Sequence, residues 1–186
     1  MYKLLKSQCN VPDKHGGADL HEPIAEDLDF NAVYQRFSPY VAAVALRLTG
    51  DASAVDDIVQ DVFFDCFRSI DSIVDFEHAR RWLRIVSVRK IRRYLKRRKL
   101  LRTFLFSPDR LPDIGVPGLT ADERAIMVRL YRILDAVPVN HRLAWTLRYL
   151  EGAELCETAD ACGCSLATVK RWIHDVHIKV TGDDHA

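Results

Sequence analysis

From Ala79 to Arg102 the sequence reads Ala-Arg-Arg-Trp-Leu-Arg-Ile-Val-Ser-Val-Arg-Lys-Ile-Arg-Arg-Tyr-Leu-Lys-Arg-Arg-Lys-Leu-Leu-Arg. The stretch holds twelve Lys or Arg and no Asp or Glu, and neither Pro nor Gly interrupts it. Its apolar residues recur at roughly helical spacing: Trp82, Leu83, Val86, Ile91, Tyr94 and Leu95. As one helix it would span about 36 Å. One face can pack on a core while another presents a strip of positive charge, which favours a polyanion such as nucleic acid as partner.

Two other interpretations of this basic stretch stay open at this point. Runs of charge are commonly solvated helix faces, and basic amphipathic helices also bind anionic membranes or protein partners. The rest of the chain has to distinguish between them.

The overall charge hides a strong asymmetry along the chain. Residues 1–79 carry 6 basic and 14 acidic groups, residues 80–102 carry 12 basic groups, and residues 103–186 carry 9 basic and 12 acidic groups; −8 + 12 − 3 gives the net charge of +1. No run of 18 apolar residues indicates a membrane span, and no signal peptide is recognisable. Five cysteines, an odd number, favour reduced thiols. We therefore expect a cytoplasmic protein.

The region before the basic stretch predicts two amphipathic helices. The first covers about residues 29–49, with a kink or restart expected at Pro39 and an end at Gly50. The second begins near Ser53, which forms a capping-box pattern with Asp56. Its apolar stripe is expected to be buried: Val55, Ile58, Val59, Val62, Phe63, Cys66, Phe67 and Ile70. Its other face carries Asp56, Asp57, Gln60, Asp61, Phe64 and Asp65. Four carboxylates on one face indicate either a basic partner or a merely solvated acidic face.

The region after the basic stretch begins with a linker rich in Pro and Gly and continues with a second helical domain. Thr120 and Glu123 form a capping-box pattern at its start. Two short helices, at about 154–161 and 166–180, meet at Gly163, and Ser165 is a suitable N-cap for the second. This is the pattern of a helix-turn-helix, whose second helix enters the major groove of DNA.

A zinc site is a rival interpretation of the same turn. Cys162, Cys164, His174 and His177 supply ligand types, although both the Cys and the His spacings are tighter than usual. The turn accounts for the cysteines as small buried residues, so we expect no metal site. No catalytic or cofactor-binding motif is present either, and we expect no cofactor and no enzymatic activity.

Two separated segments together resemble bacterial RNA polymerase sigma factors. The first is Asp56-Asp57-Ile58-Val59-Gln60-Asp61-Val62-Phe63, followed by Trp82-Leu83 and the Arg-rich helix, and is similar to sigma region 2. The second is similar to region 4: Leu134 to Pro138, Arg142, Leu147-Arg148, Glu151-Gly152, Glu157 to Ala159, Gly163 to Ser165, and Thr168 to Lys170. Two such domains joined by a bare linker resemble the extracytoplasmic-function (ECF) subfamily.

Residues 1–28 are weakly patterned and are broken by Pro12, Gly16, Gly17 and Pro23, so we expect a flexible N-terminal extension, which is beyond the family minimum. The resemblance implies an all-α fold with two small helical domains joined by a flexible linker: region 2 over 29–102, a linker over 103–119 and region 4, a helix-turn-helix, over 120–181. It further implies that the chain binds core RNA polymerase and promoter DNA, that an anti-sigma factor is a candidate partner, and that no membrane is involved.

The resemblance also assigns roles to individual residues. The acidic face would dock on the β′ clamp helices through Asp56, Asp57, Gln60 and Asp61. The loop before the basic helix would hold a base flipped from the −10 element, with Phe76 and Glu77. Phosphates of the opened strand would meet Arg89, Lys90, Arg93 and Arg97. The −35 element would be read by Ser165, Thr168, Lys170 and Arg171. Region 4 would also touch the β flap, and the linker would follow the RNA exit path.

The sequence departs from the family pattern in two places. Many members have an Asn after Trp-Leu, where this chain reads Ile85-Val86-Ser87-Val88-Arg89. The common Lys-Ser-Arg of region 4 reads Lys170-Arg171-Trp172. Two alternatives stay open: a helix-turn-helix regulator that does not engage polymerase, which leaves the acidic face unexplained, and a peripheral membrane protein held by the basic helix.

Overall fold

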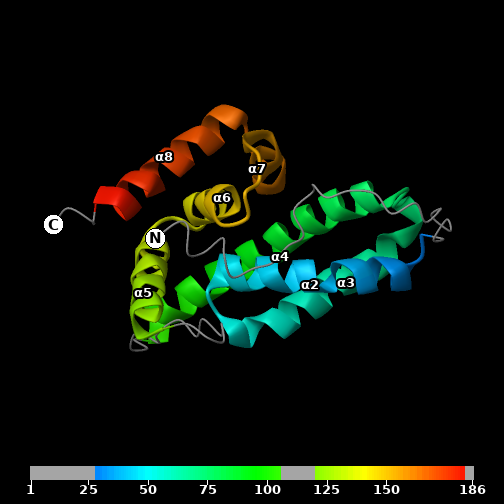
Figure 1. The fold of residues 1–186 in the computed structure, drawn as a ribbon, viewed down its shortest axis with the longest axis horizontal. Helices are drawn as coiled ribbons and strands as arrows, with labels where there is room; N and C mark the ends of the chain where they lie inside the picture. Colours follow the sequence, from blue (N-terminus) through cyan, green and yellow to red (C-terminus); the bar gives the residue numbers. More distant parts are fainter. Residues whose placement is uncertain (1–27, 106–119, 183–186) are drawn as a thin grey trace.

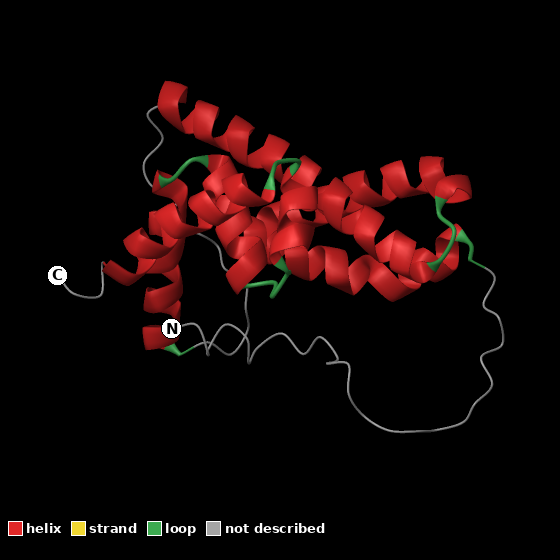
Figure 2. Ribbon diagram, turned by 90° about the horizontal axis from the view of Figure 1, so that it is seen from above, coloured by secondary structure: helices red, strands yellow, loops and turns green. Residues whose placement is uncertain are grey.

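The computed structural model describes residues 28–105 and 120–182, with side chains up to residue 101 in the first range. Within these ranges the chain forms helices and no strand (Figures 1 and 2). The α-helices are α2 (Phe30–Thr49), α3 (Val55–Ser69), α4 (Phe76–Leu105), α5 (Ala121–Ala136), α6 (Val139–Tyr149), α7 (Leu155–Cys162) and α8 (Leu166–Gly182), and the 3₁₀ turns are η1 (Ala52–Ala54) and η2 (Ile70–Ser72). The predicted all-α fold is confirmed. The predicted extension and most of the predicted linker lie outside the described residues.

The N-terminal bundle consists of α2, α3 and α4, which pack lengthwise against one another (Figure 1). Helical spacing brings one apolar stripe of each helix into a shared core, where Val33, Leu48, Val62, Leu83 and Ile91 are almost fully buried. The basic stretch is one uninterrupted helix, α4, and it extends three residues further in each direction than residues 79–102. A helix of this length spans about 45 Å, so it reaches past its own bundle.

Two local predictions in the N-terminal bundle are wrong. Helix α2 does not restart at Pro39 but continues from Phe30 to Thr49, because the surrounding apolar stripe packs well enough to keep one helix despite the lost backbone donor. The start of α3 has no side-chain cap, and Ser53 instead belongs to η1, where its backbone N–H donates to Asp51. The intervening 3₁₀ turn changes the spacing on which a capping box depends.

The C-terminal bundle consists of α5 to α8, and its predicted boundaries largely hold. Thr120 and Glu123 form the predicted capping box at the start of α5. Gly163 ends α7 in the left-handed conformation at φ 65°, which allows the tight turn into α8. The hydroxyl of Ser165 accepts from the backbone N–H of Thr168 at 3.3 Å, as expected of an N-cap. Helices α7 and α8 therefore form the predicted helix-turn-helix.

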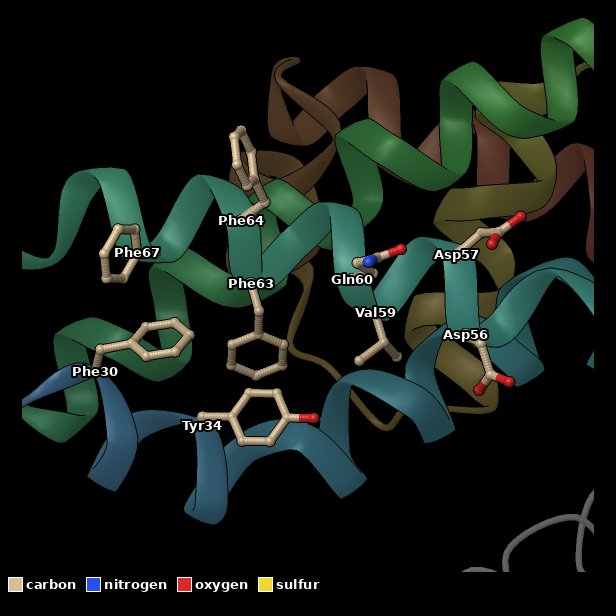
Figure 3. Close-up of a pocket in the computed structure, with 9 residues that line it drawn as sticks. All are labelled: Phe30, Tyr34, Asp56, Asp57, Val59, Gln60, Phe63, Phe64 and Phe67. Atoms are coloured by element: carbon tan, nitrogen blue, oxygen red, sulfur yellow. The ribbon is translucent and has the colours of Figure 1, made fainter.

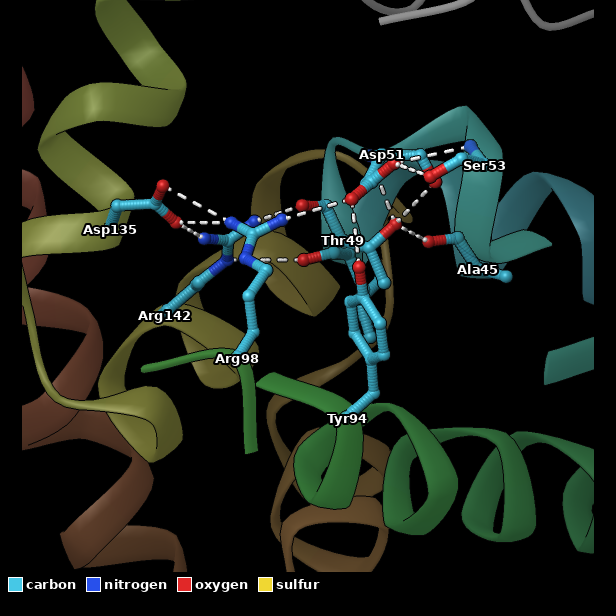
Figure 4. Close-up of polar contacts among 9 residues, drawn as sticks. Ala45, Thr49, Asp51, Ser53, Tyr94, Arg98, Asp135 and Arg142 are labelled. Atoms are coloured by element: carbon cyan, nitrogen blue, oxygen red, sulfur yellow. Dashed lines mark hydrogen bonds and ion pairs between the residues drawn. The ribbon is translucent and has the colours of Figure 1, made fainter. Parts of the chain in front are cut away.

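The two bundles pack directly against each other. Helix α4 contacts α6 and α7, and α2 contacts α6. Side chains of the C-terminal bundle complete the end of α2: the Tyr131 hydroxyl donates to the carbonyl of Arg47 at 2.8 Å, and Arg142 donates to the carbonyls of Leu48 and Thr49 at 3.1 and 2.6 Å. Arg142 also pairs with Asp135 of α5 (Figure 4). An ion pair between Arg47 and Glu151, at 2.6 Å, joins the bundles beside this cluster.

Gly50 is the residue that lets the bundles approach so closely. It ends α2 at φ 62°, and a Cβ there would lie 2.5 Å from the ring of Tyr131. Gly163 has a similar φ of 65°, but a Cβ added there would meet nothing within 4 Å. Both glycines adopt a positive φ, which disfavours other residues. Gly50 additionally leaves no room for a Cβ, because the ring of Tyr131 packs on it.

We expect Gly50→Ala to lower the free energy of unfolding by about 2–5 kcal/mol, the sum of a left-handed Ala and a displaced ring. Gly163→Ala serves as the matched control and should cost only about 1–2 kcal/mol, because no atom obstructs its methyl group. Urea unfolding of both variants measures the difference. Equal costs would show that Tyr131 does not pack on Gly50.

Candidate nucleic-acid and protein interfaces

The acidic face of α3 is exposed and has no internal partner. Asp56, Asp57, Gln60 and Asp61 are all exposed. Among the described side chains of residues 28–101 and 120–182, no basic group forms an ion pair with Asp56, Asp57 or Asp61. Three unpaired carboxylates within two turns repel one another at a small cost. Such a face is suited to a basic partner.

An aromatic hollow adjoins the acidic face. It encloses about 590 Å³ and is lined by Phe30, Tyr34, Asp56, Asp57, Val59, Gln60, Phe63, Phe64 and Phe67 (Figure 3). Phe64 and Phe67 are each 61% exposed, so the prediction that Phe67 belongs to the buried stripe is wrong. The rings of Phe30 and Phe67 meet edge to face instead, with centroids 5.3 Å apart at the rim. Exposed aromatic rings beside carboxylates indicate a protein-docking surface with an apolar and an acidic part.

Asp65 does not belong to the exposed acidic face on which the sequence pattern places it. Its carboxylate lies 3.0 Å from both Lys90 and Arg89 of α4. Burial alone would raise the pKa of Asp65, but the hydrogen bonds and charges of Lys90 and Arg89 outweigh it and lower the pKa below its usual value. Asp65 therefore joins α3 to α4 and is not part of the docking face.

The four predicted phosphate contacts on α4 fall into two classes. Arg93 and Arg97 are exposed and project from the helix without an ion pair to any described side chain. Arg89 and Lys90 share the carboxylate of Asp65, and the Lys90 side chain is only 13% exposed. A phosphate contact by Lys90 would have to compete with this internal pair, whereas Arg93 and Arg97 are free to bind.

Phe76 and Glu77 lie in the first turn of α4, so their prediction as loop residues is wrong. Phe76 is half-buried, packs against Phe37 and lies under the guanidinium of Arg36 at 4.6 Å. Its ring packs against the bundle core, because the apolar face of α4 begins at Phe76, before the basic stretch that starts at Ala79. Glu77 is exposed at the helix start.

A second hollow, which sequence reasoning missed, lies where α3 ends beside α4. It encloses about 490 Å³ and is lined by Asp65, Arg68, Ser69, Trp82, Ile85, Val86 and Arg89. Trp82 packs against the core, as expected, and also lines this hollow. An indole wall with two arginines at the rim suits a planar base attached to a phosphate backbone. In the sequence, the tryptophan at position 82 was the feature that indicated stacking on an unpaired base.

The exposed end of the helix-turn-helix carries the predicted −35 contacts. Ser165, Lys170 and Arg171 are exposed, while Thr168 is half-buried. The hydroxyls of Ser165 and Thr168 lie 2.9 Å apart and cap α8 together. Ser165 and Thr168 thus position the helix end, and Lys170 and Arg171 are the free cations beside it.

Trp172 does not belong to this exposed face. It is half-buried, and its ring stacks on His141 of α6 with centroids 5.5 Å apart. Burial lowers the pKa of His141, and the carboxylate of Asp175, 3.4 Å away, only partly opposes this shift. The aromatic residue at the position of a common family arginine is therefore a packing residue between α6 and α8.

The four residues of the rival zinc interpretation serve separate purposes. Cys162 is buried at the contact with α4, and burial raises the pKa of its thiol to about 11. His177 stacks on Tyr149. Across the described ranges, no three His, Cys, Asp or Glu side chains gather closely enough to hold a metal ion. Within the same ranges, no helix combines the length and the apolar character needed to cross a membrane.

The fold and these surfaces define a helical two-bundle protein that combines a basic helix, a helix-turn-helix and a separate docking face, the combination expected of a DNA-binding transcription protein. Residues 33–100 match the family model of Sigma-70 region 2. The chain is 27% identical over 158 residues to RNA polymerase sigma factor NccH of Alcaligenes xylosoxydans xylosoxydans, covering 82% of this chain and 84% of the relative. It is 28% identical over 144 residues to ECF RNA polymerase sigma factor EcfG of Rhodopseudomonas palustris, covering 77% and 78%.

Solved structures of similar fold agree with these matches. The sigma factor RpoE in complex with the anti-sigma factor NepR from Bartonella quintana has a TM-score of 0.62 at 20% identity, over 83% of this chain and 95% of that one. CnrH in complex with the cytosolic domain of CnrY has a TM-score of 0.56 at 20% identity, over 82% and 85%. Together, the region 2 match and the similarity to these sigma factors support placing the chain in the ECF subfamily of the sigma-70 family.

We expect Trp172→Ala to destabilise the C-terminal bundle by about 1–3 kcal/mol, because it removes the stack on His141 and leaves a partly filled cavity. Arg171→Ala, one position earlier and exposed, should change stability by less than about 0.5 kcal/mol while weakening DNA binding. Thermal unfolding and DNA binding of the two variants test this separation. The assignment of the two faces is wrong if Arg171→Ala is the destabilising variant.

Proposed function

We propose that this chain is an ECF sigma factor, which binds core RNA polymerase through the acidic face of α3 and directs it to promoters. The observation that carries the proposal is the group of unpaired carboxylates Asp56, Asp57 and Asp61 next to exposed Phe64 and Phe67. A solvated acidic face needs no exposed aromatic rings, whereas a docking face gains affinity from them. The β′ clamp helices are the proposed partner of this face.

The exposed basic side of α4 is proposed to bind the opened promoter strand. Arg93 and Arg97 are free to bind phosphates, and Arg89, four residues before Arg93, lines the hollow beside Trp82. A base that leaves the duplex at the −10 element could enter this hollow and stack on the indole. Unstacking and unpairing cost a few kcal/mol, which stacking on Trp82 and attraction of the phosphates to arginine must offset. Glu77 remains a proposed contact at the edge of this surface.

The helix-turn-helix is proposed to read the −35 element with the first turn of α8. Lys170 and Arg171 supply the charged contacts, and Ser165 and Thr168 set the entry of the helix into the major groove. In domain terms, 29–102 would serve as region 2, 103–119 as the linker along the RNA exit path, and 120–181 as region 4, which also touches the β flap. The protein acts in the cytoplasm and has no catalytic role of its own. Both solved relatives are bound to a second protein, one of them named an anti-sigma factor, which makes such a factor a candidate partner.

A helix-turn-helix regulator that never engages polymerase is the competing function. It would use α8 and the basic helix but would give the docking face on α3 no purpose. In vitro transcription with purified core polymerase, with and without this protein, on a fragmented genomic library decides the matter. New RNA 5′ ends that share upstream −35 and −10 elements support the sigma function, and failure of the protein to bind core overturns it.

We expect the double charge reversal Asp57→Lys with Asp61→Lys to weaken core polymerase binding by about 100-fold, since two attractive charges become repulsive at the docking face. The reversal leaves the fold intact because neither carboxylate has a partner among the described side chains. Asp122→Lys with Asp160→Lys, two exposed carboxylates on the C-terminal bundle, is the matched control for net charge. Equal loss in both double variants, measured by pull-down with core polymerase, would show that general charge and not this face determines binding.

A further inference from the structure

The aromatic hollow between α2 and α3 has a combination of properties that any bound segment has to match. Phe64 and Phe67 are each 61% exposed and leave apolar surface open to solvent. Asp56 and Asp57 line the same hollow and form no ion pair with a described side chain (Figure 3). Apolar rings beside unpaired carboxylates suit a segment that carries large apolar side chains together with lysine or arginine.

A segment of this kind precedes α2 in the chain, outside the described residues. Residues 2–6 read Tyr-Lys-Leu-Leu-Lys, which is three large apolar side chains and two lysines without an acidic group. Residues 7–28, in contrast, carry five acidic groups and one lysine. The carboxylates at the hollow attract the first stretch and repel the second. Charge complementarity therefore selects residues 2–6 from the N-terminal extension.

The connection between this segment and α2 is long enough for the segment to reach the hollow. Phe30, the first residue of α2, itself lines the hollow, so the connection is attached at the rim. Residues 7–29 lie in between, and a random coil of this length spans about 25 Å. The part of α3 that lines the hollow, from Asp56 to Phe67, is about 16 Å long. The segment can therefore reach all of it, at an effective concentration on the order of millimolar.

We propose that residues 2–6 bind the aromatic hollow and the acidic face of α3 within the same molecule. Leu4 and Leu5 cover the exposed rings, and Lys3 and Lys6 pair with the carboxylates at the edge. The contact itself needs no polymerase. Its consequence rests on the function proposed above, because the segment occupies the surface assigned to the β′ clamp helices. Core polymerase then has to displace the segment before it can bind.

A weak contact is enough for this effect. Two exposed ion pairs and a few apolar side chains give a dissociation constant on the order of 0.1–1 mM for the segment alone. At an effective concentration of about 1 mM, the segment occupies the hollow for half of the time or more. The affinity for core polymerase is then lowered about 2- to 10-fold, since only molecules with an empty hollow can bind.

Two double variants of the full-length chain test the proposal. Leu4→Ser with Leu5→Ser removes apolar side chains from the segment and leaves every charge in place. Leu20→Ser with Ile24→Ser is the matched control, because it removes two apolar side chains from the acidic part of the same extension. Neither variant changes a residue of the two bundles. NMR spectra recorded without polymerase report on the contact, and titration with core polymerase reports on the competition.

We expect NOEs in the unchanged protein between the methyl groups of Leu4 and Leu5 and the rings of Phe64 and Phe67. Leu4→Ser with Leu5→Ser should shift the amide resonances of residues 56–67 and tighten binding to core polymerase about 2- to 10-fold. The control variant should change neither.

A charge exchange tests the two lysines separately. Lys3→Glu with Lys6→Glu should abolish the NOEs, because four carboxylates then face one another. Adding Asp56→Lys with Asp57→Lys to that variant should bring the NOEs back, since the attraction is restored with the signs reversed.

The outcomes also separate this proposal from the proposed function. Absence of the NOEs, or equal α3 spectra of the unchanged and the Leu4→Ser, Leu5→Ser chains, overturns the proposal. Amide shifts of α3 that grow with protein concentration overturn it as well, because they show that the segment binds a second copy of the chain. NOEs in a chain that does not bind core polymerase would establish the contact and overturn the proposed sigma function alone.

Discussion

The end of α2 is the constraint on which the rest of the described structure depends. A helix leaves its last four carbonyls without partners, and here the Leu46 carbonyl receives the N–H of Gly50 within the N-terminal bundle. The carbonyls of Arg47, Leu48 and Thr49 are satisfied by Tyr131 and Arg142 of the C-terminal bundle. Arg142 is buried at 2% exposure and is tolerated there because carbonyls and Asp135 surround its guanidinium. The helix end and the arginine thus require each other.

This mutual requirement also sets the position of the helix-turn-helix. Arg142 lies in α6, and α6 packs on both α7 and α8. With Arg142 and Tyr131 in contact with α2, α7 lies along α4. There Glu157 pairs with Arg84, and the Cys162 carbonyl accepts from Arg92. The start of α8, with Lys170 and Arg171, stays exposed. The contact of Tyr131 and Arg142 with the end of α2 therefore determines which basic side chains stay exposed when the two bundles are packed together.

The sequence predicted local features well where one physical effect dominates. Periodicity located the α-helices, and the Thr120–Glu123 pair and Gly163 marked a helix start and a helix end correctly. Prediction failed where tertiary packing competes with a local rule: α2 runs through Pro39, and Phe76 belongs to a helix because its ring packs on Phe37. The sequence pattern also placed Asp65 on the docking face, since no local pattern announces a partner such as Lys90 on another helix. The contact between the bundles was not predictable, because Arg142 and Thr49 are 93 residues apart.

The basic helix shows why charge counted along a sequence does not translate into charge available for binding. Lys90 and Arg89 are engaged with Asp65 inside the N-terminal bundle, Arg84 and Arg98 are engaged with carboxylates of α7 and α5, and Arg93 and Arg97 remain in solvent. Arg84 and Arg98 lie on the side of the helix that faces the C-terminal bundle. Arg89, Arg93 and Arg97 are four residues apart and share another side, so both rotation about the helix axis and position along it determine the partner. A strongly basic helix can therefore be stable within a folded molecule of net charge +1, because acidic groups from three other helices neutralise the sides that face them. The exposed cations of α4, Arg93 and Arg97 among them, are left to attract DNA.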